Sequence, residues 1–508
     1  MKHFLICFLV LVLMPTFTPL QAKEEKAKKE EKKEEKKKDK QHSSSNSAVT
    51  THTITIAGKA LTYEATAGTI ALKGKDGKEK AKVFYIAYVA KDVKEKSKRP
   101  LTFSFNGGPG SSSVWLHLGV FGPRRVIMNK DGSVPPPPAR LTDNEYSILD
   151  KTDLVFIDPV TTGYSRAVPH DKAKSFHGVQ QDIESVGDFV RLYTTRNKRW
   201  ASPKYIAGES YGTTRAAGLV SHMAKRYGMF FNGIILVSAV LQFQTIRFTE
   251  GNDLPYILFL PTYAATAWYH KLLPQELQKL SLPELVQKAR EFAEGEYASA
   301  LLKGRRYSGT KREALVKKIA MFTGLDKSYV RESDLRISLF RYTKEVLRSR
   351  GLLVGRMDSR LTGHSLDPVN DVATYDPSLS TYIGHFGGAL NHYVRDELEY
   401  ESDLPYEILT GKVHPWDWGV FKNSFVDVAS SLRYTFCGNP SLRVFVANGY
   451  YDGATPFFAA EYTFDHMTLP GKLPTNVTMR YYEAGHMMYS HEPSLIKMKK
   501  DLADWLSN

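Results

Sequence analysis

The stretch IAGESYGTTRAAGL, residues 206–219, sets a serine between two glycines and a glutamate directly before that serine. Gly208, Ser210 and Gly212 fit the pattern G-x-S-x-G, which lifts a serine on a sharp turn between a strand and a helix. The apolar residues KYIAG lead into this turn, and RAAGLVSHMAKRY, which follows it, suits a helix. The stretch therefore predicts that Ser210 is a nucleophile held above the end of a buried strand.

Compact apolar segments recur on both sides of this turn, and segments with helical periodicity separate them. Buried strands that alternate with helices are typical of a parallel sheet with crossover helices. The predicted strands are LTFSF (101–105), DLVFID (153–158), KYIAG (204–208), GIILVS (233–238), LRVFVANG (442–449) and VTMRYYEAG (477–485). Ahead of them, THTITI, LTYEATAG, GTIALKG and KVFYIAYVA, between residues 51 and 90, predict four antiparallel strands.

The alternation stops between about residues 247 and 425, where amphipathic helical segments such as PELVQKAREFAEGEYASALLKG take over. A helical insertion just before the last strands of an α/β domain usually covers a site at the carboxyl ends of the strands. We therefore predict an α/β-hydrolase fold with a mostly parallel sheet. Its core would comprise residues 48–246 and 426–508, and residues 247–425 would form a helical cap.

A serine hydroxyl needs a base to remove its proton and a carboxylate to orient that base. In the predicted fold, the acid and the histidine follow the last two strands in that order. Asp452 comes just after one of these strands, in NGYYDGATP, and His486 just after the next, in EAGHMMY. We predict that these two residues and Ser210 form the catalytic triad. The alternatives are His466 or His491 as the base, neither of which directly follows a strand, and Asp465 as the acid.

The glycine-rich turn FSFNGGPGSSS, residues 103–113, directly follows a predicted strand. The oxyanion of an acyl-transfer reaction needs hydrogen-bond donors that are already in place. We predict that the backbone N–H groups of Gly108 and Tyr211 supply them. A phosphate-binding loop is the competing interpretation, but no lysine with serine or threonine closes the turn and no G-x-G-x-x-G spacing occurs.

Five motifs, taken together, resemble those of one enzyme family. They are NGGPGSSS, NEYSILDKTDLVFIDPVTTGYS, GESYGT, NGYYDGATP and EAGHMMY. From about Val83 to its C-terminus, the chain resembles the serine carboxypeptidases of peptidase family S10, which include carboxypeptidase Y-like and cathepsin A-like enzymes. The resemblance implies an enzyme that releases C-terminal amino acids from peptides through an acyl-enzyme, without a metal or organic cofactor. Beyond the first 22 residues the chain has a single cysteine, Cys437, and the lack of disulfides fits a bacterial-type member.

The resemblance also implies a role for the glutamate next to the serine. Asn106 and Glu209 would hydrogen-bond the C-terminal carboxylate of the substrate. Two carboxylates in contact cannot both stay ionised cheaply, so they share a proton. Glu209 would then be protonated when substrate is bound, which predicts that peptide hydrolysis is favoured at acidic pH.

Several positions depart from the pattern of the family. Val120 stands where members often carry a second glutamate, Ser104 where tryptophan is usual, and Ser111 where cysteine is usual. We expect the Val120 departure to make carboxylate binding less acid-dependent than in relatives. The departures affect substrate preference more than the mechanism.

Three other functions compete with a carboxypeptidase. An esterase or acyltransferase would use the same catalytic machinery. A proline iminopeptidase also has a GGPG loop, but usually carries histidine before that loop and glycine before the serine, where this chain has Asn106 and Glu209. A non-catalytic binding protein could keep the fold, although all three triad positions are filled.

The N-terminus predicts export. Residues 1–22 have a basic start, an apolar run and a small residue at Ala22, as in a secretory signal peptide, with an uncleaved anchor as the alternative. Residues 23–47 are rich in lysine and glutamate and predict a solvated tether. The formal net charge of +15 is spread along the chain without an aromatic-basic motif. We therefore expect a secreted or periplasmic protein that acts on peptide C-termini, with no nucleic-acid partner and no stable membrane insertion after cleavage; a dimer remains open.

Overall fold

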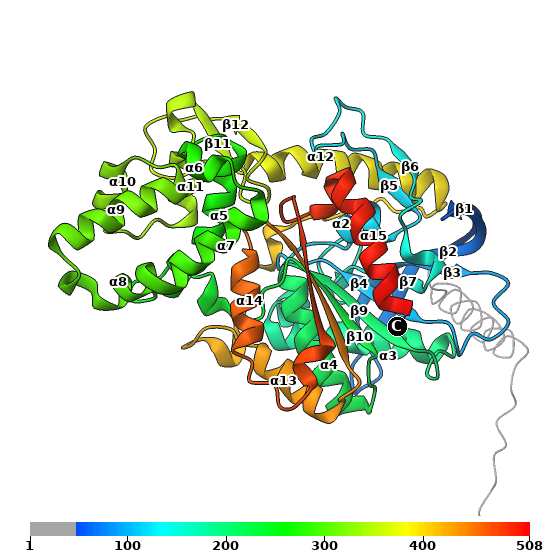
Figure 1. The fold of residues 1–508 in the computed structure, drawn as a ribbon. Helices are drawn as coiled ribbons and strands as arrows, with labels where there is room; N and C mark the ends of the chain where they lie inside the picture. The colour runs from blue at the N-terminus through cyan, green and yellow to red at the C-terminus, as the bar shows by residue number, and fades with distance from the viewer. Residues whose placement is uncertain (1–46, 508) are drawn as a thin grey trace, which may run out of the picture. The chain divides into compact units, whose positions relative to one another are not determined.

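The computed structural model describes residues 47–507. The strands of this part of the chain form a ten-stranded mixed sheet (Figure 1). Its strand order is β1-β2-β3-β7-β4-β9-β10-β13-β14, and the short β8 (Arg166–Ala167) pairs with β3. The signal peptide and nearly all of the tether predicted from the sequence lie outside the described residues. Among the helices of residues 47–507, none is both long and apolar enough to cross a bilayer.

The first three strands form an antiparallel edge, as predicted, but with fewer breaks. They are β1 (Ser47–Ile56), β2 (Lys59–Lys73) and β3 (Glu79–Ala90). The prediction of two strands in place of β2 is wrong, because the chain passes through Gly68 without a turn. Gly68 pairs with Ser47 on one side and with Tyr85 on the other, so ladders on both edges keep this glycine extended.

The other half of the sheet is parallel, which confirms the predicted arrangement. After the antiparallel β3–β7 pair, every neighbouring pair from β7 to β14 runs in the same direction. The strands are β4 (Leu101–Phe105), β7 (Asp153–Ile157), β9 (Lys204–Glu209), β10 (Gly233–Val237), β13 (Arg443–Gly449) and β14 (Val477–Tyr482). Their carboxyl ends share one edge, so residues that follow different strands can meet there.

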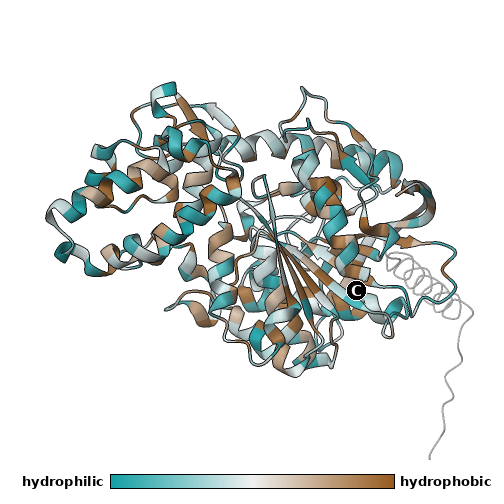
Figure 2. Cartoon of the chain, in the orientation of Figure 1, coloured by the Kyte–Doolittle hydropathy of each residue, from teal (hydrophilic) through white to brown (hydrophobic). Residues whose placement is uncertain are grey.

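Helices cover both faces of this sheet, and its central strands are apolar on both faces (Figure 2). In β10, Ile234 and Leu236 pack into one apolar cluster and Ile235 and Val237 into the other. The first cluster includes residues of α3 (Val179–Arg196), α4 (Tyr211–Tyr227), α13 (Ala429–Gly438) and α14 (Phe457–Asp465). The second includes residues of α2 (Val114–Leu116), α12 (Pro377–His392) and α15 (Glu492–Ser507). Burial on two sides explains why these strands are continuous apolar runs.

The segment between β10 and β13 is mostly helical, as predicted for residues 247–425. Seven helices of this segment contribute to two further apolar clusters, the larger of which also includes Tyr451 and residues of α14. They are α5 (Leu254–Tyr269), α6 (Gln275–Gln278), α7 (Leu282–Phe292), α8 (Ala298–Lys303), α9 (Gly309–Thr323), α10 (Lys327–Glu332) and α11 (Leu339–Glu345). A hairpin of β11 (Leu352–Val354) and β12 (Thr362–His364) follows, and the sequence did not predict it. The division of this segment from the core as a separate cap stays a prediction.

Candidate active site

Ser210 occupies a strained turn between β9 and α4. Its φ of 59° and ψ of −130° are rarely adopted by residues other than glycine. A Cβ atom on Gly208 would lie 2.3 Å from the carbonyl oxygen of Gly212, so the turn closes only because Gly208 has no side chain. The Ser210 N–H donates to the carbonyl of Val237 in the neighbouring strand (3.0 Å), which anchors the turn to the sheet.

Asp452 and His486 follow adjacent parallel strands, and their side chains meet. Asp452 Oδ2 lies 2.8 Å from His486 Nδ1, and both side chains are inaccessible to solvent. The N–H groups of Ala454 and Thr455 donate to Asp452 Oδ1, and the Thr455 hydroxyl donates to Asp452 Oδ2. These bonds fix the carboxylate, so the tautomer of His486 that carries its proton on Nδ1 is favoured.

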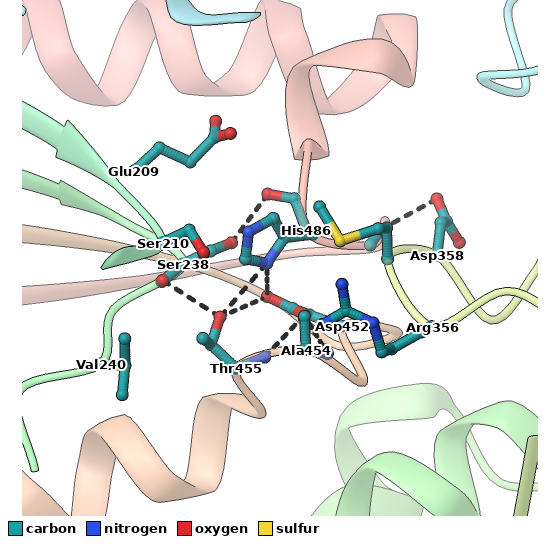
Figure 3. A network of polar contacts seen from close by, with 12 residues as sticks. Glu209, Ser210, Ser238, Val240, Arg356, Asp358, Asp452, Ala454, Thr455 and His486 are labelled. Atoms are coloured by element: carbon teal, nitrogen blue, oxygen red, sulfur yellow. Dashed lines mark hydrogen bonds and ion pairs between the residues drawn. The ribbon is translucent and has the colours of Figure 1, made fainter. Parts of the chain in front are cut away.

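The other ring nitrogen of His486 is available for a reaction. Nε2 is buried and has no hydrogen-bond partner among the described residues. Ser210 and His486 line the same cavity, of about 360 Å³, and Figure 3 shows their side chains beside each other. Burial opposes a charge on the imidazole, but the Asp452 carboxylate outweighs it and raises the pKa of His486 above its usual value. In enzymes without substrate, a hydrogen bond from serine to histidine is often long and tightens only in the reacting complex.

The turn between β11 and β12 contacts the His486 loop through hydrogen bonds. The carbonyl of Met357 accepts a hydrogen bond from the His486 N–H (2.6 Å), and Asp358 Oδ2 accepts one from the Gly485 N–H (3.1 Å). Arg360 pairs with the Asp358 carboxylate through Nε (3.0 Å) and through a terminal guanidinium nitrogen (2.6 Å). A Cβ atom on Gly485 would lie 2.4 Å from the Asp358 Cβ, so this close contact requires a glycine. Sequence reasoning missed these residues, because no motif marks the stretch GRMDSRL at 355–361.

The two amides predicted to form the oxyanion hole lie on loops that touch. A Cβ atom on Gly107 would be 2.4 Å from the Tyr211 nitrogen, which shows how closely the glycine-rich turn approaches the start of α4. Gly108 has φ of 99°, a conformation that favours glycine. Arg215 supports this turn, because it is fully buried, pairs with Asp182 (2.7 Å) and donates to the carbonyl of Asn106 (2.5 Å). Sequence reasoning did not identify Arg215.

Glu209 and Asn106 are in contact, as the family resemblance implied. Asn106 Nδ2 donates to Glu209 Oε1 (2.9 Å), and the hydroxyl of Tyr489 donates to Glu209 Oε2 (2.7 Å). Both Asn106 and Glu209 are buried and line the cavity that contains Ser210. Burial raises the pKa of Glu209 to about 7 against the opposing effects of His486 and of these two donors. Near neutral pH this carboxyl can therefore gain or lose its proton.

Tyr489 lies close to Gly119 and belongs to the same apolar cluster as Val120, one of the residues that depart from the family pattern. Its ring would clash with any side chain at Gly119, where a Cβ atom would lie 2.3 Å from the ring. Val120, the next residue, is buried in the same apolar cluster as Tyr489. The partner of Glu209 Oε2 is thus a phenol that stays neutral, since burial raises the pKa of Tyr489 well above its usual value.

The alternative catalytic residues lie elsewhere. His466 is exposed and stacks on Tyr462, and Asp465 beside it is also exposed. His491 bonds the hydroxyl of Ser494 and does not line the Ser210 cavity. Cys437 is exposed on the surface.

Part of the chain is similar in sequence to a curated carboxypeptidase. Over 120 residues the chain is 38% identical to the pheromone-processing carboxypeptidase KEX1 of Saccharomyces cerevisiae. That match spans 22% of this chain and 15% of the relative, so it covers only a small part of the relative's length.

The fold of this chain is shared by a solved carboxypeptidase structure. The crystal structure of Kex1(delta)p, a prohormone-processing carboxypeptidase from Saccharomyces cerevisiae, superposes with a TM-score of 0.54 and 18% identity, over 88% of this chain and 91% of that one. The likeness shows that both have the α/β-hydrolase fold predicted here. A proline iminopeptidase from Mycobacterium smegmatis gives a TM-score of 0.35 at 12% identity, over 90% of this chain and 98% of that one.

A family model extends the match to nearly the whole described chain. The model of the serine carboxypeptidases matches residues 58–498, which include the Ser210 turn, the glycine-rich turn and the loops of Asp452 and His486. The chain therefore belongs to the serine carboxypeptidase family.

Proposed function

We propose that this protein is a serine carboxypeptidase that releases the last amino acid of a peptide through an acyl-enzyme. The observation that carries the proposal is the joining of two groups in one cavity: Ser210 beside His486, and Glu209 with Asn106. The first group suits attack on a carbonyl, and the second suits binding of a carboxylate. An enzyme that reads a chain end needs both.

In this proposal, the oxygen of Ser210 attacks the last peptide carbonyl while Nε2 of His486 removes the hydroxyl proton. The C–N bond then breaks, and His486 returns the proton to the departing amino group. Water hydrolyses the acyl-enzyme by the same steps in reverse order. Asp452 holds the imidazole in the required tautomer, and the N–H groups of Gly108 and Tyr211 stabilise the oxyanion.

The carboxylate of the leaving residue would lie against Asn106 and Glu209. Protonated Glu209 can donate a hydrogen bond to that carboxylate, whereas ionised Glu209 would repel it. Because burial brings the pKa of Glu209 to about 7, substrate binding would favour the protonated form and acidic conditions. Such a preference for a free carboxylate separates a carboxypeptidase from an esterase or acyltransferase.

The test compares an N-blocked dipeptide with its C-terminal amide, using the wild type and Ser210→Ala. We expect rapid cleavage of the free acid, little cleavage of the amide, and a loss of about 10⁴-fold or more in the variant. Labelling of the wild type, but not of the variant, by a fluorophosphonate would identify Ser210 as the nucleophile. Equal rates on acid and amide would contradict the role of Glu209 and favour an esterase or acyltransferase.

We also propose that the protein is secreted or periplasmic. The support is the sequence of residues 1–22, with its basic start and short apolar run. Fractionation of the expressing cells, followed by N-terminal sequencing, would test both the location and cleavage near Ala22. An intact N-terminus in the membrane fraction would favour an anchor.

A further inference from the structure

The cavity beside Ser210 contains one residue that keeps its charge at every pH of interest. Its charged or titratable lining residues are Glu209, Arg356, His414 and His486. Glu209 loses its charge below about pH 7, and the histidines can only add positive charge. The guanidinium of Arg356 is therefore the permanent charge among the described residues that line the cavity.

The hydrogen-bond donors of this guanidinium are largely unused. Its one charged partner is Asp376, with Nε 3.8 Å from Oδ2, and it makes no side-chain hydrogen bond to the described residues. The other oxygen of Asp376 is occupied at the start of α12, where it accepts from the N–H and hydroxyl of Ser378. The Arg356 side chain is 37% exposed, so its remaining N–H groups can reach a ligand in the cavity.

The backbone of Arg356 is fixed beside the Asp452 loop. Its N–H donates to Asp376 Oδ1 (3.0 Å), and its carbonyl accepts from the N–H of Gly453 (3.0 Å). Figure 3 shows Arg356 and Glu209 on opposite sides of the His486 imidazole. If Glu209 marks the carboxylate of the leaving residue, Arg356 faces the acyl side, where the penultimate residue of the substrate lies.

We infer that Arg356 makes this enzyme prefer peptides with an acidic penultimate residue, Asp or Glu. This inference rests on the proposed carboxypeptidase function. A side-chain carboxylate in the cavity would pair with the guanidinium, beside apolar lining residues that include Pro109, Leu379 and Leu409. A penultimate lysine would meet a like charge.

The expected preference is moderate because the arginine is partly exposed and Asp376 offsets some of its charge. Ion pairs in such surroundings are screened by water. We expect kcat/KM for a penultimate Glu to exceed that for the neutral isostere Gln by roughly tenfold. Lysine at the same place would be cleaved more slowly than Gln.

The test uses three N-blocked dipeptides with the same C-terminal phenylalanine and Glu, Gln or Lys before it. The assay runs near pH 6, where the substrate glutamate is ionised. The enzymes are the wild type, Arg356→Gln, Arg356→Lys and Arg356→Glu. Arg433→Gln is the matched control, since Arg433 is exposed on α13 and does not line the cavity, yet its loss changes the net charge equally.

We expect the ratio of kcat/KM for Glu over Gln to fall to about one in Arg356→Gln and below one in Arg356→Glu. Arg356→Lys and Arg433→Gln would keep a ratio well above one. Equal rates on Glu and Gln in the wild type would overturn the inference, as would an unchanged ratio in Arg356→Gln. The ratio in the wild type and the ratio in Arg356→Lys each test the inference without Arg356→Gln. The test therefore stands even if Arg356→Gln folds poorly.

Two further outcomes separate this inference from the proposed function. If all three peptides are cleaved at equal rates and Ser210→Ala cleaves none, the carboxypeptidase stands and the role of Arg356 falls. If the wild type cleaves none of them, both fall. A second series of dipeptides, with Glu, Gln or Lys at the C-terminal position, tests which substrate residue Arg356 contacts. A preference for Glu that occurs only at the C-terminal position would overturn the assignment of Arg356 to the acyl side.

Discussion

The hydroxyl of Tyr489 lies 2.7 Å from Glu209 Oε2 and donates a hydrogen bond to it, although only 3% of Glu209 is exposed. A buried carboxylate without donors would be expensive to ionise. Tyr489 and Asn106 supply one donor to each oxygen. Burial raises the pKa of Glu209 to about 7, and His486 together with these two donors partly offsets that effect. The ionisation of Glu209 is thus set within the range where the enzyme would work.

Peptide hydrolysis should decline above about pH 7, because Glu209 loses the proton that it shares with the substrate carboxylate. We expect KM for a free-acid peptide to rise through this range while KM for an ester substrate without a carboxylate stays level. On acidification, protonation of His486 should lower kcat/KM for the ester, whereas for the free-acid peptide the protonation of Glu209 opposes this loss. The measurement is a pair of pH profiles from pH 4 to 9, and a flat KM for the free acid from pH 4 to 8 would contradict the role of Glu209.

Glu209→Gln should remove the rise of KM at high pH. The amide of glutamine donates a hydrogen bond at every pH and carries no charge, so it can contact the substrate carboxylate without a shared proton. We expect KM for the free-acid peptide to vary less than about threefold between pH 5 and 8 in this variant. If its KM follows the wild-type profile, another group controls binding.

The same substitution should stabilise the protein at high pH. The pKa of Glu209 is raised from 4.5 to about 7 on folding, so the folded state holds the proton more tightly and loses stability as the pH rises from about 4.5 to 7. This penalty amounts to about 3 kcal/mol. Glu209→Gln should therefore gain in Tm over the wild type at pH 8, compared with pH 5. The exposed Glu294→Gln is the control, and an equal gain there would point to a general charge effect.

Tyr489→Phe should shift the pH profile upward. The Tyr489 hydroxyl stabilises the ionised form of Glu209, so its loss raises the pKa of that carboxyl further. We expect the rise of KM for the free acid to move up by about one pH unit. Tyr382→Phe is the matched control, because Tyr382 is a buried tyrosine whose hydroxyl contacts Ser490. An identical midpoint in Tyr489→Phe and wild type would argue against the coupling.

Asp358→Asn should slow catalysis without weakening substrate binding. The change removes the countercharge of buried Arg360 and loosens the support of the Gly485–His486 loop. We expect kcat to fall by about 10- to 100-fold, with KM within about threefold of the wild type. The rate of fluorophosphonate labelling at Ser210 should fall in parallel. A kcat within twofold of the wild type would show that the Asp358 carboxylate is not needed to position the loop.

The sequence predicts the parallel sheet and the meeting of distant residues well, because both depend on local patterns. The strands before Ser210 and Asp452, β9 and β13, are buried on both faces, so each reads as an apolar run. The strand before His486, β14, is a partly exposed edge strand, but it runs parallel to β13 and its carboxyl end lies at the same edge of the sheet. The motif GESYGT, which contains Glu209, predicted that this carboxyl lies beside Ser210. The length of β2 was misread, because Gly68 resembles a turn residue in isolation.

Residues that act through packing between distant segments could not be predicted in the same way. Asp358 lies 127 positions before Gly485, and its contact depends on how the turn between β11 and β12 packs against the His486 loop. Arg215 and Tyr489 sit within or next to recognised motifs, yet their partners, Asp182 and Glu209, come from other elements. No periodicity or spacing in the sequence records these pairings.

The turn at 355–361 has a consequence for protein engineering. Its backbone is bonded to both the Asp452 loop, through Gly453, and the His486 loop, through Met357. Residues 247–425 therefore include a turn that supports the catalytic loops and cannot be exchanged freely. A graft that replaces residues 247–425 with a shorter linker would remove the carbonyl that receives the His486 N–H. Transplants designed to change selectivity should keep this turn and exchange only the helices before it.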